Sequence, residues 1–130
     1  MDQAKEGSVR MNIYESAEDY LEAILMLQEE KGYVRSVDIA ARLAVTKPSV
    51  SFAMKRLREN GYILMDEENL ITLTESGAAI AQRVYGRHKV LSSFLEQLGV
   101  SPKTAREDAC KIEHDISEET FAVIRDHLRT

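Results

Sequence analysis

The sequence has one cysteine, two prolines and no tryptophan among its 130 residues. A single cysteine excludes an internal disulfide and suits a reducing compartment. No apolar stretch approaches the roughly 20 residues that a transmembrane helix needs, and the first ten residues lack the apolar segment of a secretory signal. These absences predict a cytoplasmic protein that makes no contact with a membrane.

Motifs of common enzyme classes are also missing. The chain has no His-Glu-x-x-His motif, no glycine-rich phosphate loop and no serine nucleophile motif. An enzyme in which Glu113 or Glu22 activates a metal-bound water would need an open coordination position and a substrate cleft. Such an enzyme would also leave the basic segment described next without a role. We therefore predict that the chain is not an enzyme and takes no small organic substrate.

Positive charge is concentrated in one segment of an acidic chain. The net charge is −5, yet residues 35–62 contain six basic and two acidic side chains, a local charge of +4. A basic segment on an acidic body is typical of a nucleic-acid-binding surface.

The same segment has the pattern of a winged helix. Ser36 is expected to cap a short helix over residues 37–43, and Pro48 suits the first turn of a second helix that ends at Asn60-Gly61. Two short β-type runs follow, at residues 62–65 and 70–73. With a preceding helix that Ser16 is expected to cap, these elements predict a winged helix-turn-helix with a small β-hairpin wing. We assign residues 1–74 to this domain, with residues 1–15 as a flexible N-terminus.

Side chains on the outer side of the second helix are the candidates for DNA contact. Val50, Met54 and Leu57 share the opposite, apolar side. The basic candidates would meet phosphates, whereas serine, proline and phenylalanine could meet base edges and thymine methyls. The absence of arginine near the helix start favours A·T-rich half-sites, and the acidic tip at residues 66–68 should lie away from phosphate. The predicted DNA-binding residues are Arg35, Lys47, Pro48, Ser49, Ser51, Phe52, Lys55, Arg56 and Arg58.

The remainder, residues 75–130, is predicted to be entirely helical. Thr74, Ser101 and Ser117 are each expected to cap one of three helices. More apolar residues are present than these helices need internally, so part of the set is expected to form a homodimer contact. They are Phe94, Leu95, Leu98, Val100, Phe121, Val123 and Ile124.

Six potential metal ligands occur at helical spacing. Residues three and four apart share a helix face, so each cluster can direct its donors to one point. Taken singly, each residue has an ordinary structural explanation: a carboxylate at a helix N-terminus, a surface histidine, a small buried cysteine. Together, a thiolate, carboxylates and imidazoles suit a divalent transition metal. The candidates are Asp19, Glu22, His88, Cys110, Glu113 and His114.

Several segments resemble the diphtheria toxin repressor family of metal-dependent regulators. They include Glu18-Asp19-Tyr20-Leu21-Glu22, Leu73-Thr74-Glu75-Ser76-Gly77, Arg87-His88-Lys89-Val90-Leu91 and Asp108-Ala109-Cys110-Lys111-Ile112-Glu113-His114. The resemblance is to a short two-domain form without an SH3-like third domain, and it covers nearly the whole chain from Ser16. It implies a dimer that binds palindromic operator DNA and represses metal-uptake genes when Mn²⁺ or Fe²⁺ is plentiful. It also implies that all six candidates are ligands.

The details combine two branches of that family. Asp19 and Glu22 resemble the manganese-sensing branch, whereas Cys110 resembles the iron-sensing branch. Hard carboxylates favour Mn²⁺ and a thiolate favours softer ions, so we expect Mn²⁺ first and Fe²⁺ next. Whether Cys110 binds through sulfur or through its carbonyl oxygen is left open.

Our hypothesis for the switch is that metal binding fixes the spacing of the two recognition helices in a dimer. That spacing must match half-sites about one helical turn, ~34 Å, apart or a multiple of it. The alternative is a winged-helix regulator without metal dependence.

Overall fold

The structure is a computed structural model that describes the backbone of residues 2–129 and the side chains of residues 17–128. The chain forms two compact units, Met1–Gln82 and Arg83–Thr130. Within the part of the chain that is described, no helix is both long and apolar enough to cross a membrane.

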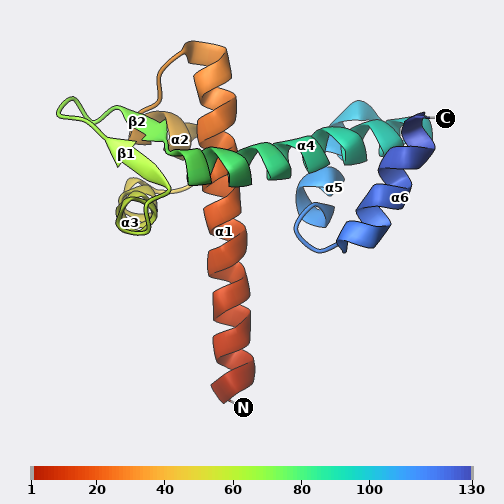
Figure 1. The fold of residues 1–130 in the computed structure, drawn as a ribbon, viewed down its shortest axis with the longest axis horizontal. Helices are drawn as coiled ribbons and strands as arrows, with labels where there is room; N and C mark the ends of the chain where they lie inside the picture. The colour runs from red at the N-terminus through yellow and green to blue at the C-terminus, as the bar shows by residue number, and fades with distance from the viewer. Residues whose placement is uncertain (1, 130) are drawn as a thin grey trace. The chain divides into compact units, whose positions relative to one another are not determined.

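The first unit contains three helices and a hairpin (Figure 1). Helix α1 spans Asp2–Lys31 and ends before Gly32, whose φ of 83° suits a residue without a side chain. Helix α2 spans Ser36–Leu43, and α3 spans Lys47–Glu59. The brief turn between α2 and α3 passes through Ala44 in the left-handed conformation. These two helices and their turn form the predicted helix-turn-helix.

The wing follows α3 directly. Strands β1 (Ile63–Met65) and β2 (Ile71–Leu73) pair antiparallel, with Leu64 opposite Thr72. In Figure 1 the hairpin lies beside α3, in agreement with the contacts between α3 and β1. Ile63 and Ile71 are buried while Leu64 and Thr72 are exposed, the alternation expected of a strand pair with one covered face.

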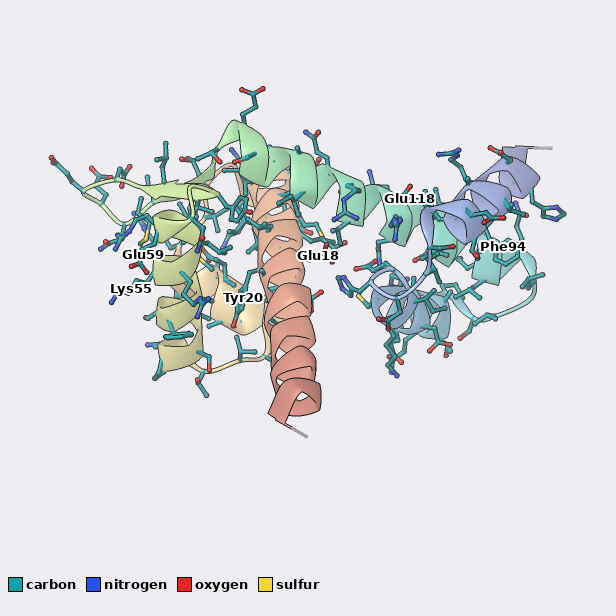
Figure 2. All side chains as sticks on the ribbon, turned by 60° about the horizontal axis from the view of Figure 1, so that its bottom comes forward. Glu18, Tyr20, Lys55, Glu59, Phe94 and Glu118 are labelled. Carbon is teal, nitrogen blue, oxygen red and sulfur yellow. The ribbon has the colours of Figure 1, made fainter. Side chains whose placement is uncertain are left out.

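An apolar core holds these elements together. Its members are the buried residues Tyr20, Leu21, Ile24, Leu27, Val34, Ile39, Val50, Met54, Leu57, Ile63, Ile71 and Ala81. They come from every helix of the first unit and from both strands. Figure 2 shows Tyr20 between α1 and α3. Because the inner side of α3 is anchored in this core, its outer side has a defined direction.

Helix α4 (Glu75–Gln97) begins in the first unit and ends in the second. Its start is fixed by Thr74, whose Oγ1 accepts a hydrogen bond from the Gly77 N–H at 3.2 Å. Gly77 lies so close to the wing that an added Cβ would be 2.0 Å from the Tyr62 carbonyl oxygen. A residue without a side chain is therefore required at this contact.

The second unit consists of the rest of α4 with α5 (Pro102–Ile112) and α6 (Glu118–Arg129). Ser101 and Ser117 cap α5 and α6 as predicted, accepting hydrogen bonds from the backbone N–H groups of Thr104 and Thr120. The mainly helical fold with a winged helix-turn-helix is thus confirmed.

Three helix boundaries differ from expectation. Helix α1 begins at Asp2 rather than Ser16, because the preceding residues include no proline and a single glycine in a helix costs only about 1 kcal/mol. The predicted capping role of the Ser16 side chain lies outside the described side chains. Ser36 does not cap α2 but is its first residue; the Asp38 carboxylate accepts a hydrogen bond from the Arg35 N–H at 2.9 Å instead. Helix α5 ends at Ile112, so it does not include Glu113 and His114, which the helical spacing had placed on one helix with Cys110.

Candidate DNA-binding surface and metal centre

Helix α3 has a buried side and an exposed side. Thr46 starts it by accepting a hydrogen bond from the Ser49 N–H at 3.3 Å. Val50, Met54 and Leu57 point into the core. The nine predicted DNA-binding residues, Arg35, Lys47, Pro48, Ser49, Ser51, Phe52, Lys55, Arg56 and Arg58, are all exposed. Figure 2 shows Lys55 on the side of α3 that faces away from α1.

Two aromatic side chains accompany the basic residues on this unit. The Phe52 side chain is 63 % exposed, and the Arg56 guanidinium lies 5.8 Å from its ring centre. Tyr33, which the sequence analysis did not single out, is 47 % exposed and lies near the cationic groups of Lys31 and Arg35. Large exposed rings held by cations are suited to contact with a partner rather than with water alone.

The wing tip forms a tight acidic turn. Asp66 Oδ1 accepts hydrogen bonds from the N–H groups of Glu68 and Leu70 at 2.8 and 2.9 Å. Asp66, Glu67 and Glu68 are all exposed. A concentrated negative charge disfavours close approach to phosphate. The positively charged surface of this unit is therefore on α3 and not on the wing tip.

The second unit brings three predicted ligands together. His88 is on α4, Cys110 is on the last turn of α5, and Glu113 is the C-cap residue directly after α5. One donor atom from each lies within 4.8 Å of the others. His88 Nδ1 is 3.1 Å from Glu113 Oε2 and 3.8 Å from Cys110 Sγ. We call this group the His88–Cys110–Glu113 cluster.

The cluster holds a proton on His88 when no cation is bound. Hydrogen bonds from its ring to Cys110 and Glu113 raise the pKa of His88 to about 10, although burial acts in the opposite direction. The imidazolium charge then balances the buried carboxylate of Glu113, whose side chain has no exposed area.

The donors fit a divalent transition metal. Glu113 Oε1 is buried and makes no hydrogen bond; His114 Nε2 lies 3.5 Å from it. A buried carboxylate oxygen without a hydrogen bond is costly unless a cation satisfies it. Imidazole, thiolate and carboxylate together suit ions such as Mn²⁺, Fe²⁺, Co²⁺ or Zn²⁺.

The remaining predicted ligands are His114, Asp19 and Glu22. His114 follows Glu113 immediately after α5 and is half-buried. Asp19 and Glu22 belong to α1 in the first unit, where Asp19 is half-buried and Glu22 is 6 % exposed. Their part in metal binding stays a prediction.

Sequence reasoning missed Arg87, a buried arginine beside the cluster. It is 6 % exposed, and its Nη1 donates hydrogen bonds to the carbonyl oxygens of Glu113 and Ile116 at 3.1 and 3.2 Å. The sequence did contain a signal: Arg87 is three residues after Val84 and four before Leu91, both buried, so it lies on the inner side of α4.

The predicted dimer residues divide into two groups. Leu98 and Val123 are 66 % and 64 % exposed, whereas Phe121 is buried. Phe94 packs edge-on against the His127 ring at 6.2 Å. Within the described part of the second unit, Leu98 and Val123 are thus the apolar side chains of the set that are most open to a partner.

Family models cover almost the whole chain. Residues 12–69 match the N-terminal DNA-binding domain of the iron-dependent repressors, and residues 74–130 match the metal-binding and dimerisation domain. The chain belongs to the iron-dependent repressor family. The first match contains α2, α3 and strand β1 of the wing, and the second contains the His88–Cys110–Glu113 cluster.

Curated relatives of this iron-dependent repressor are transcriptional regulators. The transcriptional regulator MntR of Escherichia coli O6:H1 is 44 % identical over 111 residues, which cover 85 % of this chain and 72 % of the relative. The HTH-type transcriptional regulator MntR of Bacillus subtilis is 40 % identical over 102 residues, covering 78 % and 72 %.

Solved structures agree with the family. IdeR of T. acidophilum matches with a TM-score of 0.79 at 29 % identity, covering 87 % of this chain and 54 % of that one. A manganese-dependent transcriptional repressor in complex with manganese matches with a TM-score of 0.78 at 32 % identity, covering 86 % and 52 %. The repressor described here thus spans about half the length of these solved chains.

Family membership confirms several predictions. This iron-dependent repressor is a metal-responsive transcriptional regulator with a DNA-binding domain and a metal-binding and dimerisation domain. It is not an enzyme, since the family consists of transcriptional regulators. Its two domains indicate DNA and a second copy of the chain as its partners.

Proposed function

We propose that this regulator is a repressor that binds palindromic operator DNA as a homodimer when Mn²⁺, or next Fe²⁺, is bound. It would act in the cytoplasm and control metal-uptake genes. The observation that carries the proposal is the His88–Cys110–Glu113 cluster, a compact set of three different donors in the domain that the family uses for metal binding.

The proposed ligands are His88, Cys110, Glu113 and His114, with Asp19 and Glu22 added on the basis of the sequence pattern. A bound divalent cation would supply positive charge that offsets the carboxylates and hold its ligands at fixed distances. His88 Nδ1 has to release its proton for this, and Glu113 then offers two buried carboxylate oxygens. The bound cation would therefore favour the arrangement of the second unit in which these ligands lie close together. This is a population shift towards the conformation with the higher affinity for the metal.

The donor set supports Mn²⁺ without excluding softer ions. Carboxylate ligands favour Mn²⁺, and relatives at 40–44 % identity are named MntR. Cys110 Sγ lies 3.8 Å from His88 Nδ1, within the cluster, so its sulfur can add affinity for Fe²⁺, Co²⁺ or Zn²⁺. We propose that this sulfur broadens the range of ions bound while the carboxylates set the preference for Mn²⁺.

On DNA, α3 would enter the major groove with its exposed side. Lys47, Lys55, Arg56 and Arg58 contact phosphates in this proposal, and Arg35 contacts the backbone from the start of α2. Pro48, Ser51 and Phe52 face the bases. Ser49 also takes part in the cap, since its Oγ accepts a hydrogen bond from Thr46 at 2.9 Å, which leaves its own hydroxyl proton for a base or phosphate.

The test is a DNA-binding assay on a library of operator sequences, run in EDTA and then with Mn²⁺, anaerobic Fe²⁺ and Zn²⁺ in turn. We expect binding only with Mn²⁺ or Fe²⁺, on two-fold symmetric sites. Glu113→Ala should abolish the metal response. Glu107→Ala removes an exposed carboxylate from the same helix and serves as the control. Equal binding in EDTA would contradict the proposal and favour a winged-helix regulator without metal dependence.

A further inference from the structure

We propose that Arg87 is a positioning residue that holds Glu113 in place for metal binding and connects the cluster to α6. The inference rests on the proposed function, because it concerns the same metal site. It follows from four contacts that one buried guanidinium makes, which we call the Arg87 bridge.

The first part of the Arg87 bridge closes the end of α5. Glu113 is the C-cap residue of this helix, and its N–H donates a hydrogen bond to the Ala109 carbonyl. The last carbonyl groups of a helix have no partner within the helix. Arg87 Nη1 supplies one, donating to the carbonyls of Glu113 at 3.1 Å and Ile116 at 3.2 Å. A cation at this end also interacts favourably with the helix dipole.

The second part reaches α6. Arg87 Nη2 forms an ion pair with Glu118, the first residue of α6. The Arg87 guanidinium also lies 5.1 Å from the ring centre of Phe121, one turn further along α6. The Arg87 side chain is 7 % exposed, so water competes weakly for its bonds to the two carbonyls, whereas the Glu118 carboxylate is 78 % exposed and its ion pair is screened by water. One side chain thus joins α4, the end of α5 and the start of α6.

The position of Arg87 ties these contacts to metal binding. Arg87 precedes His88 in α4, and it bonds the main chain of Glu113, the residue whose side chain lies 3.1 Å from His88. Any displacement of the end of α5 from α4 lengthens the distance between these two donors. Partners that orient metal ligands typically contribute 10- to 100-fold in metal affinity.

A planar, forked guanidinium is needed for this role. It donates in several fixed directions at once, whereas the lysine ammonium is a single point charge on a flexible chain. Arg87→Lys should therefore keep the charge but lose part of the Arg87 bridge. Arg125→Met is the matched control, because Arg125 also stacks on Phe121, at 5.8 Å, and forms its ion pair with Asp126 rather than with a residue of the Arg87 bridge.

The experiment measures Mn²⁺ affinity through the electron paramagnetic resonance signal of the free ion. It also records the visible absorption of the Co²⁺-saturated protein as a readout of ligand geometry. We expect Arg87→Met to weaken Mn²⁺ binding by about 10- to 100-fold and to change the Co²⁺ spectrum. Arg87→Lys should fall between Arg87→Met and the unaltered protein, and Arg125→Met should match the unaltered protein in both measurements.

The outcomes separate the inference from the proposed function. If the unaltered protein binds Mn²⁺ and Arg87→Met binds it equally well with the same Co²⁺ spectrum, Arg87 is not a positioning residue and the inference is overturned. If the unaltered protein binds neither ion, the proposed function itself fails. A purely structural role would lower the melting temperature of Arg87→Met while leaving its Mn²⁺ affinity and Co²⁺ spectrum unchanged, and this result would also overturn the inference. If Arg87→Met does not fold, Arg87→Lys decides the question.

Discussion

Raising the pH should strengthen metal binding, because His88 holds a proton that competes with the cation. The pKa of His88 is raised to about 10 by hydrogen bonds to Cys110 and Glu113. At pH 7 the ring is thus protonated. Binding a metal through Nδ1 then requires the ring to lose its proton at a pH about three units below the pKa of His88. At 1.36 kcal/mol per unit this costs about 4 kcal/mol, or roughly a thousandfold in apparent affinity.

The folding stability of the metal-free protein should change with pH in the opposite direction to the metal affinity. A histidine whose pKa is raised by folding contributes stability that is fully present below its unfolded value, near 6.5, and is lost as the pH rises through the folded value. Between pH 7 and 9 we therefore expect metal affinity to rise about tenfold per pH unit while the metal-free protein becomes less stable.

The assay is isothermal titration calorimetry of Mn²⁺ binding between pH 6 and 8.5, repeated in buffers with different ionisation enthalpies. The difference in heat between buffers reports the number of protons released. His88→Gln is the control, since it removes this titration, and its residual affinity should vary less with pH. A flat pH profile of the unaltered protein with no proton release would refute the reasoning.

Three further predictions follow from single sites. Cys110→Ser should weaken Co²⁺ binding and remove the near-ultraviolet thiolate band while Mn²⁺-dependent DNA binding persists; an unchanged Co²⁺ spectrum would mean that the sulfur is not a ligand. Gly77→Ala should destabilise the protein by roughly 1–3 kcal/mol in urea unfolding, because its Cβ would be placed 2.0 Å from the Tyr62 carbonyl oxygen. An unchanged midpoint would show that the wing moves freely away from α4. Lys55→Gln should weaken binding to all DNA sequences alike and reduce by about 1 the slope of log affinity against log salt concentration, because Lys55 contacts a phosphate in our proposal. A change in sequence preference would instead assign Lys55 to a base.

Local signals in the sequence were sufficient for most of the fold. Thr46 and Pro48 start α3, and Asn60-Gly61 ends it, because these residues satisfy or forgo backbone hydrogen bonds at helix ends. The buried and exposed sides of α3 followed from its apolar periodicity in the same way. Helix ends and helix sides depend on residues a few positions apart, so they can be predicted from the sequence alone.

The site was predicted only in part, because it depends on packing between distant segments. The spacing of Cys110 and Glu113 placed two donors on one face of α5, but the contact of Glu113 with His88 joins residues 25 apart. Arg87 was missed for a related reason. A buried arginine is rare unless it is paired, and its partners are two main-chain carbonyls and Glu118, which no sequence motif reveals.

The location of Glu113 at the very end of α5 bears on how quickly the protein can respond. The final turn of a helix opens at a lower free energy than its middle, without unfolding of the whole unit. Arg87 bonds the carbonyl of Glu113 at this end, so in our proposal a bound ion is released when these bonds open, without unfolding of the whole unit. Slow exchange would suit a structural metal, whereas a sensor has to lose its ion soon after the supply falls. Under the proposed function, the strength of the Arg87 contacts at this helix end would set how quickly the regulator leaves its operator.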